Sequence, residues 1–224
     1  MKLLILRPEP GASETAARAR AMGLEAAVAP LFAIRSVAGP PLAAGRYEAV
    51  LLTSANGARH APEGLTALPC FAVGERTAAA ARAAGFAEVR SGPCDGAAAA
   101  AMMAKAGIKR AIHLCGRDHL EVAAPGVEIE RRIVYAAEPV ANERFEGRAV
   151  AMIHSARAGA RFAELVVDKA AIAVAAISEA AAAAAGDGWA AKAVAAEPRD
   201  QALLELAAKL CNHAVDVVRD GDGL

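Results

Sequence analysis

Short apolar runs alternate with alanine-rich stretches along almost the whole chain. The apolar runs predict strands at 3–6, 26–29, 31–34, 49–52, 70–73, 87–90, 111–114, 127–135, 149–153, 171–177 and 192–195. The alanine-rich stretches predict helices at 13–22, 56–60, 76–84, 96–106, 156–165, 179–185 and 200–210, the first one capped by Ser13. Strands that are apolar on both faces and separated by helices are typical of a parallel sheet covered on both sides. The pattern therefore predicts an α/β fold.

Two segments of the chain are repeated later in the same order. Residues 49–60 (AVLLTSANGARH) resemble 149–162 (AVAMIHSARAGARF), and residues 71–86 (FAVGERTAAAARAAGF) resemble 175–189 (AAISEAAAAAAGDGW). This repeat predicts two similar α/β units. The opening strand, helix and strand are then placed beside the C-terminal unit. We expect a discontinuous domain of residues 1–34 plus 140–224 and an inserted domain of residues 35–139.

Composition and charge narrow the classes of function. Lys plus Arg and Asp plus Glu number 25 each, and this neutrality argues against a protein that works mainly by holding nucleic acid or an anionic membrane. An anionic small molecule stays open, because a pocket can be locally positive on a neutral protein. No uncharged apolar stretch reaches the roughly 18 residues of a membrane helix, and the first ten residues do not have the pattern of a signal peptide.

The four cysteines are scattered and fit no zinc pattern: Cys70, Cys94, Cys115 and Cys211. They indicate buried thiols in a reducing compartment, and we expect a cytoplasmic protein. The neutral charge and the 4% aromatic content favour a monomer. The histidines show no paired metal-ligand spacing, and no nucleotide-binding or hydrolase motif is present. No metal site therefore stands out, and a nucleotide cofactor lacks a motif.

Polar residues gather where the predicted strands end. In open α/β sheets, ligands bind outside the carboxyl ends of the strands. Most of these turns lead into a predicted helix, and we expect the turn after residues 111–114 to do so as well. The first N–H groups of a helix favour anions. Ordinary helix capping by Ser, Thr and Asn is the alternative explanation. The candidate binding residues are Arg7, Thr53, Ser54, Asn56, Gly74, Thr77, Gly116, Arg117, Ser155, Arg157 and Ser178.

Tyr135 ends the long extended segment that returns the chain to the discontinuous domain. A tyrosine at this crossing is placed near any cleft between the domains. The alternative is an interface aromatic with a solvated hydroxyl.

The chain resembles the uroporphyrinogen-III synthase family in an ordered set of segments. These are LLILRPEP near the start, LLTSANGAR at 51–59, FAVGERTAAAARAAGF at 71–86, GRD at 116–118, VYAAEP at 134–139, HSARAGARF at 154–162 and, less closely, AISEAAAAAAG at 176–186. The resemblance implies two similar domains joined by a two-stranded connection, with the active site in the cleft between them. It implies a cofactor-free lyase that closes hydroxymethylbilane, a linear tetrapyrrole with eight carboxylates, into uroporphyrinogen III.

Site roles follow from the same resemblance. Thr53, Ser54 and Asn56 match the family's substrate-facing turn, and Gly74 and Thr77 match its G-x-x-T turn. Ser155 and Arg157 match the equivalent turn of the second domain. Tyr135 matches the tyrosine that the family places near the leaving hydroxyl, as a proton or hydrogen-bond donor.

The chain also departs from the family pattern. Residues 178–181 read SEAA, where relatives usually read GPTT, so two hydroxyls are missing and only Ser178 could compensate. Two alternatives therefore stay open. One is a non-catalytic member of the same fold that binds tetrapyrroles or other polycarboxylates. The other is an unrelated two-domain α/β receptor or regulator for a small anion.

Overall fold

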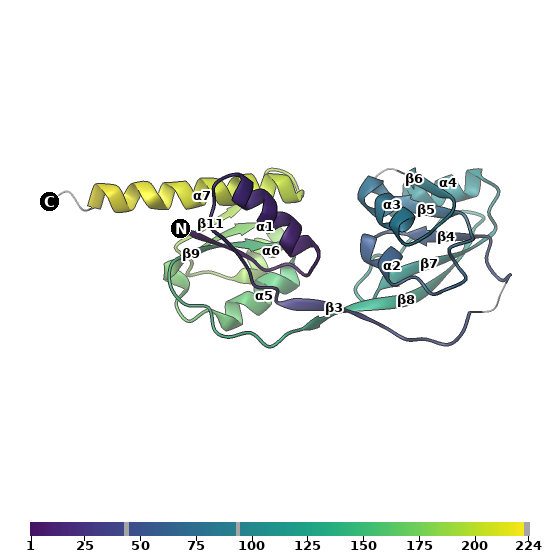
Figure 1. The fold of residues 1–224 in the computed structure, drawn as a ribbon, viewed down its shortest axis with the longest axis horizontal. Helices are drawn as coiled ribbons and strands as arrows, with labels where there is room; N and C mark the ends of the chain where they lie inside the picture. Colours follow the sequence, from purple (N-terminus) through teal and green to yellow (C-terminus); the bar gives the residue numbers. More distant parts are fainter. Residues whose placement is uncertain (43–44, 93–94, 222–224) are drawn as a thin grey trace. The chain divides into compact units, whose positions relative to one another are not determined.

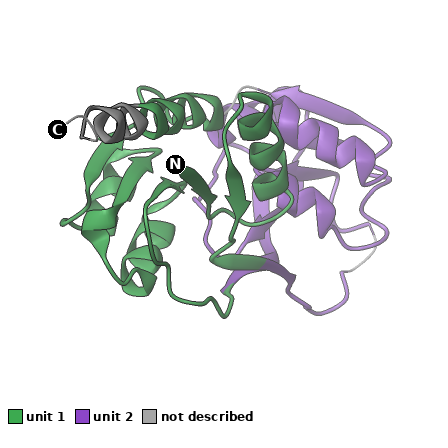
Figure 2. Cartoon of the chain, turned by 60° about the vertical axis from the view of Figure 1, so that its left-hand side comes forward, with its two compact units in different colours: residues 1–33, 139–224 green, residues 34–138 purple. Residues whose placement is uncertain are grey.

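The chain folds into two compact units in the computed structural model (Figures 1 and 2). Residues 1–42, 45–92 and 95–221 are described, those after residue 212 by their backbone alone. Unit 1 comprises Met1–Ala33 and Pro139–Leu224, and unit 2 comprises Ile34–Glu138. Each unit contains its own sheet, which confirms the predicted α/β fold class with two parallel-sheet units.

Unit 2 is built on a six-stranded sheet with the order β3-β8-β7-β4-β5-β6. The pairs β7–β8, β4–β7, β4–β5 and β5–β6 are all parallel. Strands β3 and β8 both cross the boundary between the units and are hydrogen-bonded neighbours. The strands are β3 (Phe32–Ser36), β4 (Ala49–Leu52), β5 (Cys70–Val73), β6 (Val89–Gly92), β7 (Arg110–Gly116) and β8 (Glu128–Pro139).

Helices cover both faces of this sheet. Helices α2 (Ala55–Arg59) and α3 (Gly74–Ala83) pack with Val50 and Leu52, while α4 (Gly96–Lys105) packs with Leu51 from the opposite face. Successive strand residues point to opposite faces, so a strand that is apolar throughout must be covered twice. Small alanine side chains on these helices allow them to pack close to the strands.

Unit 1 has a five-stranded, fully parallel sheet with the order β11-β10-β9-β1-β2. Helices α1 and α7 share one core with Leu3, Ile5, Val150 and Met152. Helices α5 and α6 pack on β9 and β10, and the short helix η1 precedes β10. The elements are β1 (Lys2–Ile5), α1 (Gly11–Ala21), β2 (Ala26–Val28), β9 (Ala149–Ile153), α5 (Ala156–Leu165), η1 (Lys169–Ala171), β10 (Ile172–Ala176), α6 (Glu179–Ala185), β11 (Ala191–Val194) and α7 (Asp200–Gly221).

The two sheets have the same spatial order once their strands are matched. Along unit 2 the chain runs β4, β5, β6, β7, β8, and the spatially equivalent strands of unit 1 are β9, β10, β11, β1, β2. Unit 1 is thus a circular permutation of unit 2, because its last two strands come from the start of the chain. In unit 2 the chain places β4, β5 and β6 successively toward one edge of the sheet and then returns to place β7 and β8 on the other side of β4. This reversal of direction lies between β4 and β7 in unit 2 and between β9 and β1 in unit 1. Such a reversal is where open α/β sheets bind ligands.

The structure corrects two local predictions. Ser13 is not the cap of the first helix, which begins at Gly11 after Pro10; instead the Glu9 carboxylate accepts hydrogen bonds from the Ser13 backbone N–H and hydroxyl. The fixed φ of proline suits a helix start, so the helix begins before the serine. The turn after β7 was expected to lead into a helix like the other strand ends. Residues 117–127 contain no helix.

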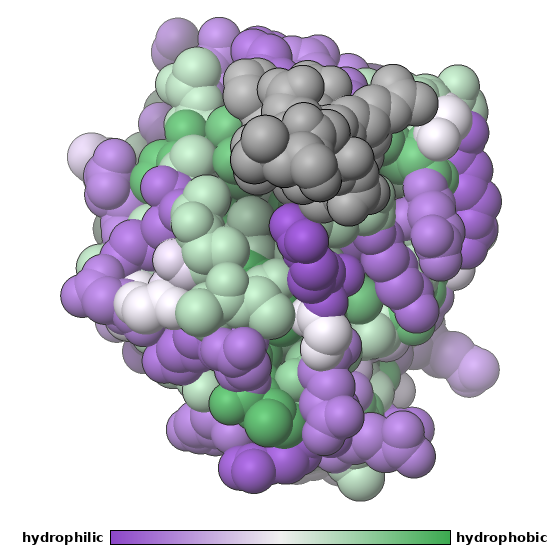
Figure 3. Space-filling view, turned by 90° about the vertical axis from the view of Figure 1, so that its left-hand side faces the viewer, coloured by the Kyte–Doolittle hydropathy of each residue, from purple (hydrophilic) through white to green (hydrophobic). Residues whose placement is uncertain are grey.

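Most of the surface shown in Figure 3 is an interleaved mixture of hydrophilic and weakly hydrophobic residues. In the described part of the chain, no helix is both long enough and apolar enough to cross a membrane. Cys70, Cys115 and Cys211 are buried free thiols, as predicted, and Cys94 lies outside the described residues.

Candidate functional site

A pocket of about 390 Å³ opens in unit 2 at the reversal between β4 and β7. Thr53 and Ser54 enter it from the end of β4, and Gly116 enters from the end of β7. Tyr135 reaches it from β8, and the N-terminus of α4 closes another side. The polar side chains that line it are Thr53, Ser54, Asp95, Asp118, His119, Glu121 and Tyr135.

The segment after β7, which contains no helix, forms one wall of this pocket. Residues 118–122 line the pocket from the irregular segment between β7 and β8. In unit 1 the equivalent connection, between β1 and β2, contains helix α1. The site therefore depends on the absence of a helix after β7, which the sequence pattern did not predict.

Ser54 and Tyr135 form a hydroxyl pair in the pocket. Ser54 is the N-cap of α2, and its Oγ accepts a hydrogen bond from the Gly57 backbone N–H at 3.1 Å. The same Oγ lies 2.9 Å from the Tyr135 hydroxyl oxygen. When Ser54 donates its own proton to Tyr135, the phenol proton is left for a ligand. The helix cap thus orients the tyrosine hydroxyl.

Gly116 makes room for the Tyr135 ring. A Cβ added at Gly116 would lie 2.6 Å from the ring atom Cζ and 2.9 Å from the hydroxyl oxygen of Tyr135. The ring also stacks on His60, with 6.0 Å between the centroids. Gly116 was predicted as a binding residue, and the structure shows that it also fixes where the tyrosine can lie.

The Thr53 hydroxyl is hydrogen-bonded to a buried histidine. The Thr53 hydroxyl lies 2.9 Å from Nε2 of His113, whose side chain is fully buried in β7. Burial, reinforced by the nearby charges of His119 and Arg131, lowers the pKa of His113 to about 4. His113 is therefore neutral near pH 7.

The pocket contains carboxylates as well as hydroxyl donors. Asp95 caps α4 by accepting from the Ala97 N–H at 3.0 Å, and Glu121 is paired with Arg131 at 2.9 Å. No lysine or arginine is among the described residues that line it. The side-chain donors that face a ligand here are thus hydroxyl groups, because His119 Nδ1 lies 2.9 Å from the Gly116 carbonyl oxygen and its Nε2 lies 3.3 Å from Arg131 Nη1. No cluster of three or more potential metal-ligating side chains is found in the described residues.

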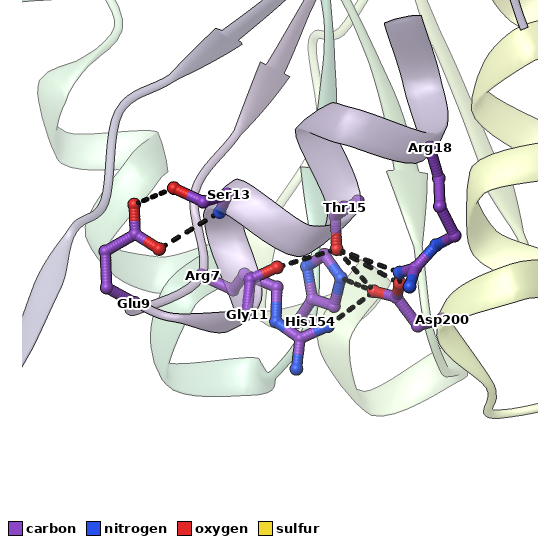
Figure 4. Close-up of polar contacts among 8 residues, drawn as sticks. All are labelled: Arg7, Glu9, Gly11, Ser13, Thr15, Arg18, His154 and Asp200. Carbon is purple, nitrogen blue, oxygen red and sulfur yellow. Dashed lines mark hydrogen bonds and ion pairs between the residues drawn. The ribbon is translucent and has the colours of Figure 1, made fainter. Parts of the chain in front are cut away.

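At the equivalent reversal in unit 1, the chain's own carboxylate takes the central place (Figure 4). Asp200, the first residue of α7, accepts from Arg7 and from His154 Nε2, each at 2.6 Å. It is also paired with Arg18 and accepts from the Thr15 hydroxyl at 3.0 Å. These partners come from α1 and from the turns after β1 and β9, so one carboxylate joins four segments of the unit.

The Asp200 carboxyl is held in its charged form. Burial raises its pKa, but the hydrogen bond from His154 and the charge of Arg7 outweigh burial, and the net pKa is well below the usual value. Burial lowers the pKa of His154, although Asp200 partly offsets this. Arg7, predicted to bind a ligand, is thus paired within its own unit.

The remaining predicted residues have local partners or lie outside the pocket. Ser155 and Ser178 cap α5 and α6 in the same way as Ser54 caps α2, which is the alternative explanation considered above. Gly74 and the buried Thr77 lie in α3 and do not line the pocket.

Three further candidates have partners at the surface. Arg117 pairs with Glu138 at 2.8 Å, Asn56 accepts from Arg59 at 3.0 Å, and the guanidinium of Arg157 lies 4.4 Å from the ring centroid of Phe32. Within unit 2, the predicted residues that the structure brings together at the pocket are Thr53, Ser54, Gly116 and Tyr135.

Several residues of the two sites were missed in the sequence. Asp95, Asp118, His119 and Glu121 line the pocket, and Asp200 organises the cluster in unit 1. Asp200 had one usable signal, its place at the start of the last predicted helix, where a carboxylate is favoured. The partners of that carboxylate are 46 to 193 residues away in sequence, and nothing local indicates them.

Tandem doubly wound α/β units, one permuted relative to the other, define the class of protein: a two-unit α/β protein with polar sites at its sheet reversals. The particular family is identified by a family model for uroporphyrinogen-III synthase (HemD), which matches residues 13–205. The chain therefore belongs to the uroporphyrinogen-III synthase family. The members of this family are lyases of porphyrin and heme biosynthesis, and family membership implies a small-molecule tetrapyrrole as the substrate.

Comparison with one solved structure agrees with this assignment at the level of the fold. A crystal structure of uroporphyrinogen-III synthetase from Helicobacter pylori is 15% identical, with a TM-score of 0.65, covering 93% of this chain and 98% of that one. A mutant uroporphyrinogen III synthase from the extremely thermophilic bacterium Thermus thermophilus is also 15% identical, with a TM-score of 0.47, covering 95% of this chain and 99% of that one. No curated protein sequence matches the chain.

Proposed function

We propose that this protein converts hydroxymethylbilane to uroporphyrinogen III, with loss of water and inversion of the terminal pyrrole ring. The observation that carries the proposal is the Ser54–Tyr135 hydroxyl pair, 2.9 Å apart, in an open pocket of a chain that belongs to this family. A hydroxyl leaving group needs a proton donor, and a phenol held by a helix cap is suited to that role.

The first step breaks the bond between carbon and the leaving hydroxyl. The pyrrole nitrogen supplies the electron pair, and the oxygen takes a proton from Tyr135 and departs as water. The substituted carbon of the terminal ring then attacks the azafulvene carbon, forming a spiro intermediate. The bond between the spiro carbon and its original bridging carbon then breaks, and its electron pair returns to the terminal ring. The freed bridging carbon bonds to the unsubstituted α-carbon of that ring, which is thereby inverted. The proton finally lost from ring carbon balances the one taken from the phenol.

Positioning carries most of the expected rate gain. The same precursor closes without inversion to isomer I, so the protein must hold the chain in the geometry that favours attack by the substituted carbon. Neutral hydroxyl donors such as Thr53 bind carboxylate oxygens without the strong general acids that would promote premature loss of water.

A coupled assay tests the proposal. Porphobilinogen and a deaminase that produces hydroxymethylbilane are supplied with and without this protein, and the oxidised porphyrins are separated by isomer. We expect isomer III in its presence. Isomer I alone, with folded protein, would refute the proposal and favour a non-catalytic tetrapyrrole-binding role.

Tyr135→Phe tests the proton donor directly. General acid catalysis contributes typically about 10²–10⁴-fold, so we expect kcat/KM to fall by at least about 100-fold. Tyr47→Phe is the matched control, because Tyr47 is the other tyrosine, is buried in the unit 2 core and does not line the pocket. Equal activity of Tyr135→Phe and wild type would remove the proton-donor role.

A further inference from the structure

A histidine at position 113 lowers the stability of the fold, because its polar ring is buried within the sheet. It lies in β7 with Leu51 of β4 and Arg131 of β8 as its cross-strand neighbours, and its side chain is 0% exposed. Its Nδ1 has no hydrogen-bond partner among the described residues, although the atom is buried. A buried polar group with one unmade hydrogen bond costs stability that an apolar residue here would not. Among the described residues, the ring's one hydrogen bond is the bond to Thr53.

The unpartnered nitrogen decides which tautomer fits the site. A neutral imidazole has one N–H donor and one acceptor nitrogen. If the proton were on Nδ1, a buried N–H would have no acceptor, and orphaned buried N–H groups are rarer than under-satisfied acceptors. The proton is therefore on Nε2, and His113 donates to Thr53 Oγ1 across 2.9 Å.

This bond determines what Thr53 offers to the pocket. Its oxygen accepts from His113, so its own proton is free to donate. Within the described part of the chain, His113 is the one hydrogen-bond partner of the Thr53 hydroxyl. Thr53 also lines the pocket, so the free proton has a ligand oxygen as its available acceptor.

We infer that His113 is a positioning residue, whose Nε2–H fixes the Thr53 hydroxyl as a hydrogen-bond donor to a carboxylate oxygen of the substrate. The inference rests on the proposed function for the identity of the substrate. Its structural half, the Nε2-protonated imidazole bound to Thr53, does not depend on that function. Ser54, which is oriented by its own helix cap, needs no such support.

A double-mutant cycle measures whether His113 acts through Thr53. Thr53→Val removes the hydroxyl and keeps the shape, and we expect KM for hydroxymethylbilane to rise about 10-fold with kcat nearly unchanged, because a ground-state contact is lost. His113→Leu should raise KM about as much. The double variant should be no worse than Thr53→Val alone. Two independent 10-fold losses that multiply would overturn the inference.

His113→Gln provides the rescue. Its amide N–H can take the place of Nε2–H, so we expect KM to return toward the wild-type value. Unfolding midpoints are measured for every variant. If His113 had only a structural role, the change in KM would track the loss of stability and would be the same whether residue 53 is Thr or Val. A glutamine variant as impaired as the leucine variant would also overturn the inference.

Nitrogen NMR of the imidazole separates this inference from the proposed function. We expect His113 in the wild-type protein to be protonated at Nε2 and bare at Nδ1 at pH 7, whatever the enzyme does. An Nδ1-protonated ring would overturn the inference even if isomer III is formed. Formation of isomer I alone by wild type, with the Nε2 tautomer present, would instead refute the proposed function and leave the His113–Thr53 bond in place.

Discussion

The two sheet reversals of this protein are built on the same strand order and are used in opposite ways. In unit 1 the place beyond β9 and β1 is taken by the Asp200 carboxylate, which is bound by Arg7, Arg18 and His154 (Figure 4). In unit 2 the place beyond β4 and β7 is an open pocket lined by hydroxyl groups. One reversal stabilises its own unit, and the other leaves its hydrogen-bonding capacity for a ligand.

The physical basis of the difference is a pair of helices. In unit 1, α1 follows β1 and supplies Thr15 and Arg18, and α7 supplies Asp200 from its first turn. In unit 2, no helix follows β7, and the acidic residue at the start of α4, Asp95, is used to cap its own helix. A site whose charged groups pair with groups of the same unit, as Asp200 does, is a structural site. A site whose donors lack internal acceptors is available for binding.

The largest expected effect comes from breaking the unit 1 cluster. Asp200→Ala removes the carboxylate that Arg7 and His154 each contact at 2.6 Å, in surroundings where their side chains are only 19% and 11% exposed. Removing one partner of a buried ion pair costs about 3–5 kcal/mol. We expect the free energy of unfolding, measured in urea, to fall by about 4 kcal/mol.

The matched control is Glu197→Gln, which breaks an exposed pair with Arg199 near the same helix start. Exposed pairs contribute about 0–1 kcal/mol, so little change is expected. Hydrogen exchange should accelerate in unit 1 after Asp200→Ala and not in the strands of unit 2. Similar losses for the two variants would show that the cluster is not a structural centre.

The next effect concerns pH and His113 in unit 2. Its pKa is about 4 in the folded protein and about 6.5 when unfolded, so the unfolded state binds more protons between these values. Stability therefore falls as pH falls through this window, by about 3 kcal/mol from this residue, and falls no further from it below about pH 4. Urea unfolding of wild type and His113→Leu at pH 7 and pH 4 measures this. Parallel pH slopes would contradict the expected contribution.

The smallest effect separates capping from function. Ser54→Ala, Ser155→Ala and Ser178→Ala each remove one N-cap and should each cost about 1 kcal/mol of stability. Ser54→Ala should reduce turnover more than Ser155→Ala does, because only Ser54 also contacts Tyr135. Equal losses of turnover would remove the distinction between the two reversals.

Features with local causes were predictable from the sequence. The strand at 70–73 was placed correctly because an apolar run lies between Pro69 and Gly74. The serine caps were also foreseen as an alternative, since a serine before a helical stretch has a local partner three residues on. The helix start at Ser13 was wrong because Pro10 and Glu9 provide an earlier start.

Contacts between segments that are distant in the sequence could not be predicted from it. Nothing near Thr53 indicates His113, which is 60 residues away and reaches it only because β4 and β7 pair side by side. The strand-end residues of the pocket were predicted, but its wall of residues 118–122 was missed, because it belongs to a segment after β7 in which the expected helix is absent.

The sequence by itself determined the alternation of buried strands and alanine helices, the repeat, and the three serine caps. These depend on periodicity and on hydrogen bonds over three residues, which a short window of sequence contains. The tertiary structure alone decided that Arg7 meets Asp200, that Tyr135 meets Ser54 and Gly116, and that one reversal is filled while the other is open. Strand order brings these groups together, and strand order is set by the packing of the whole sheet.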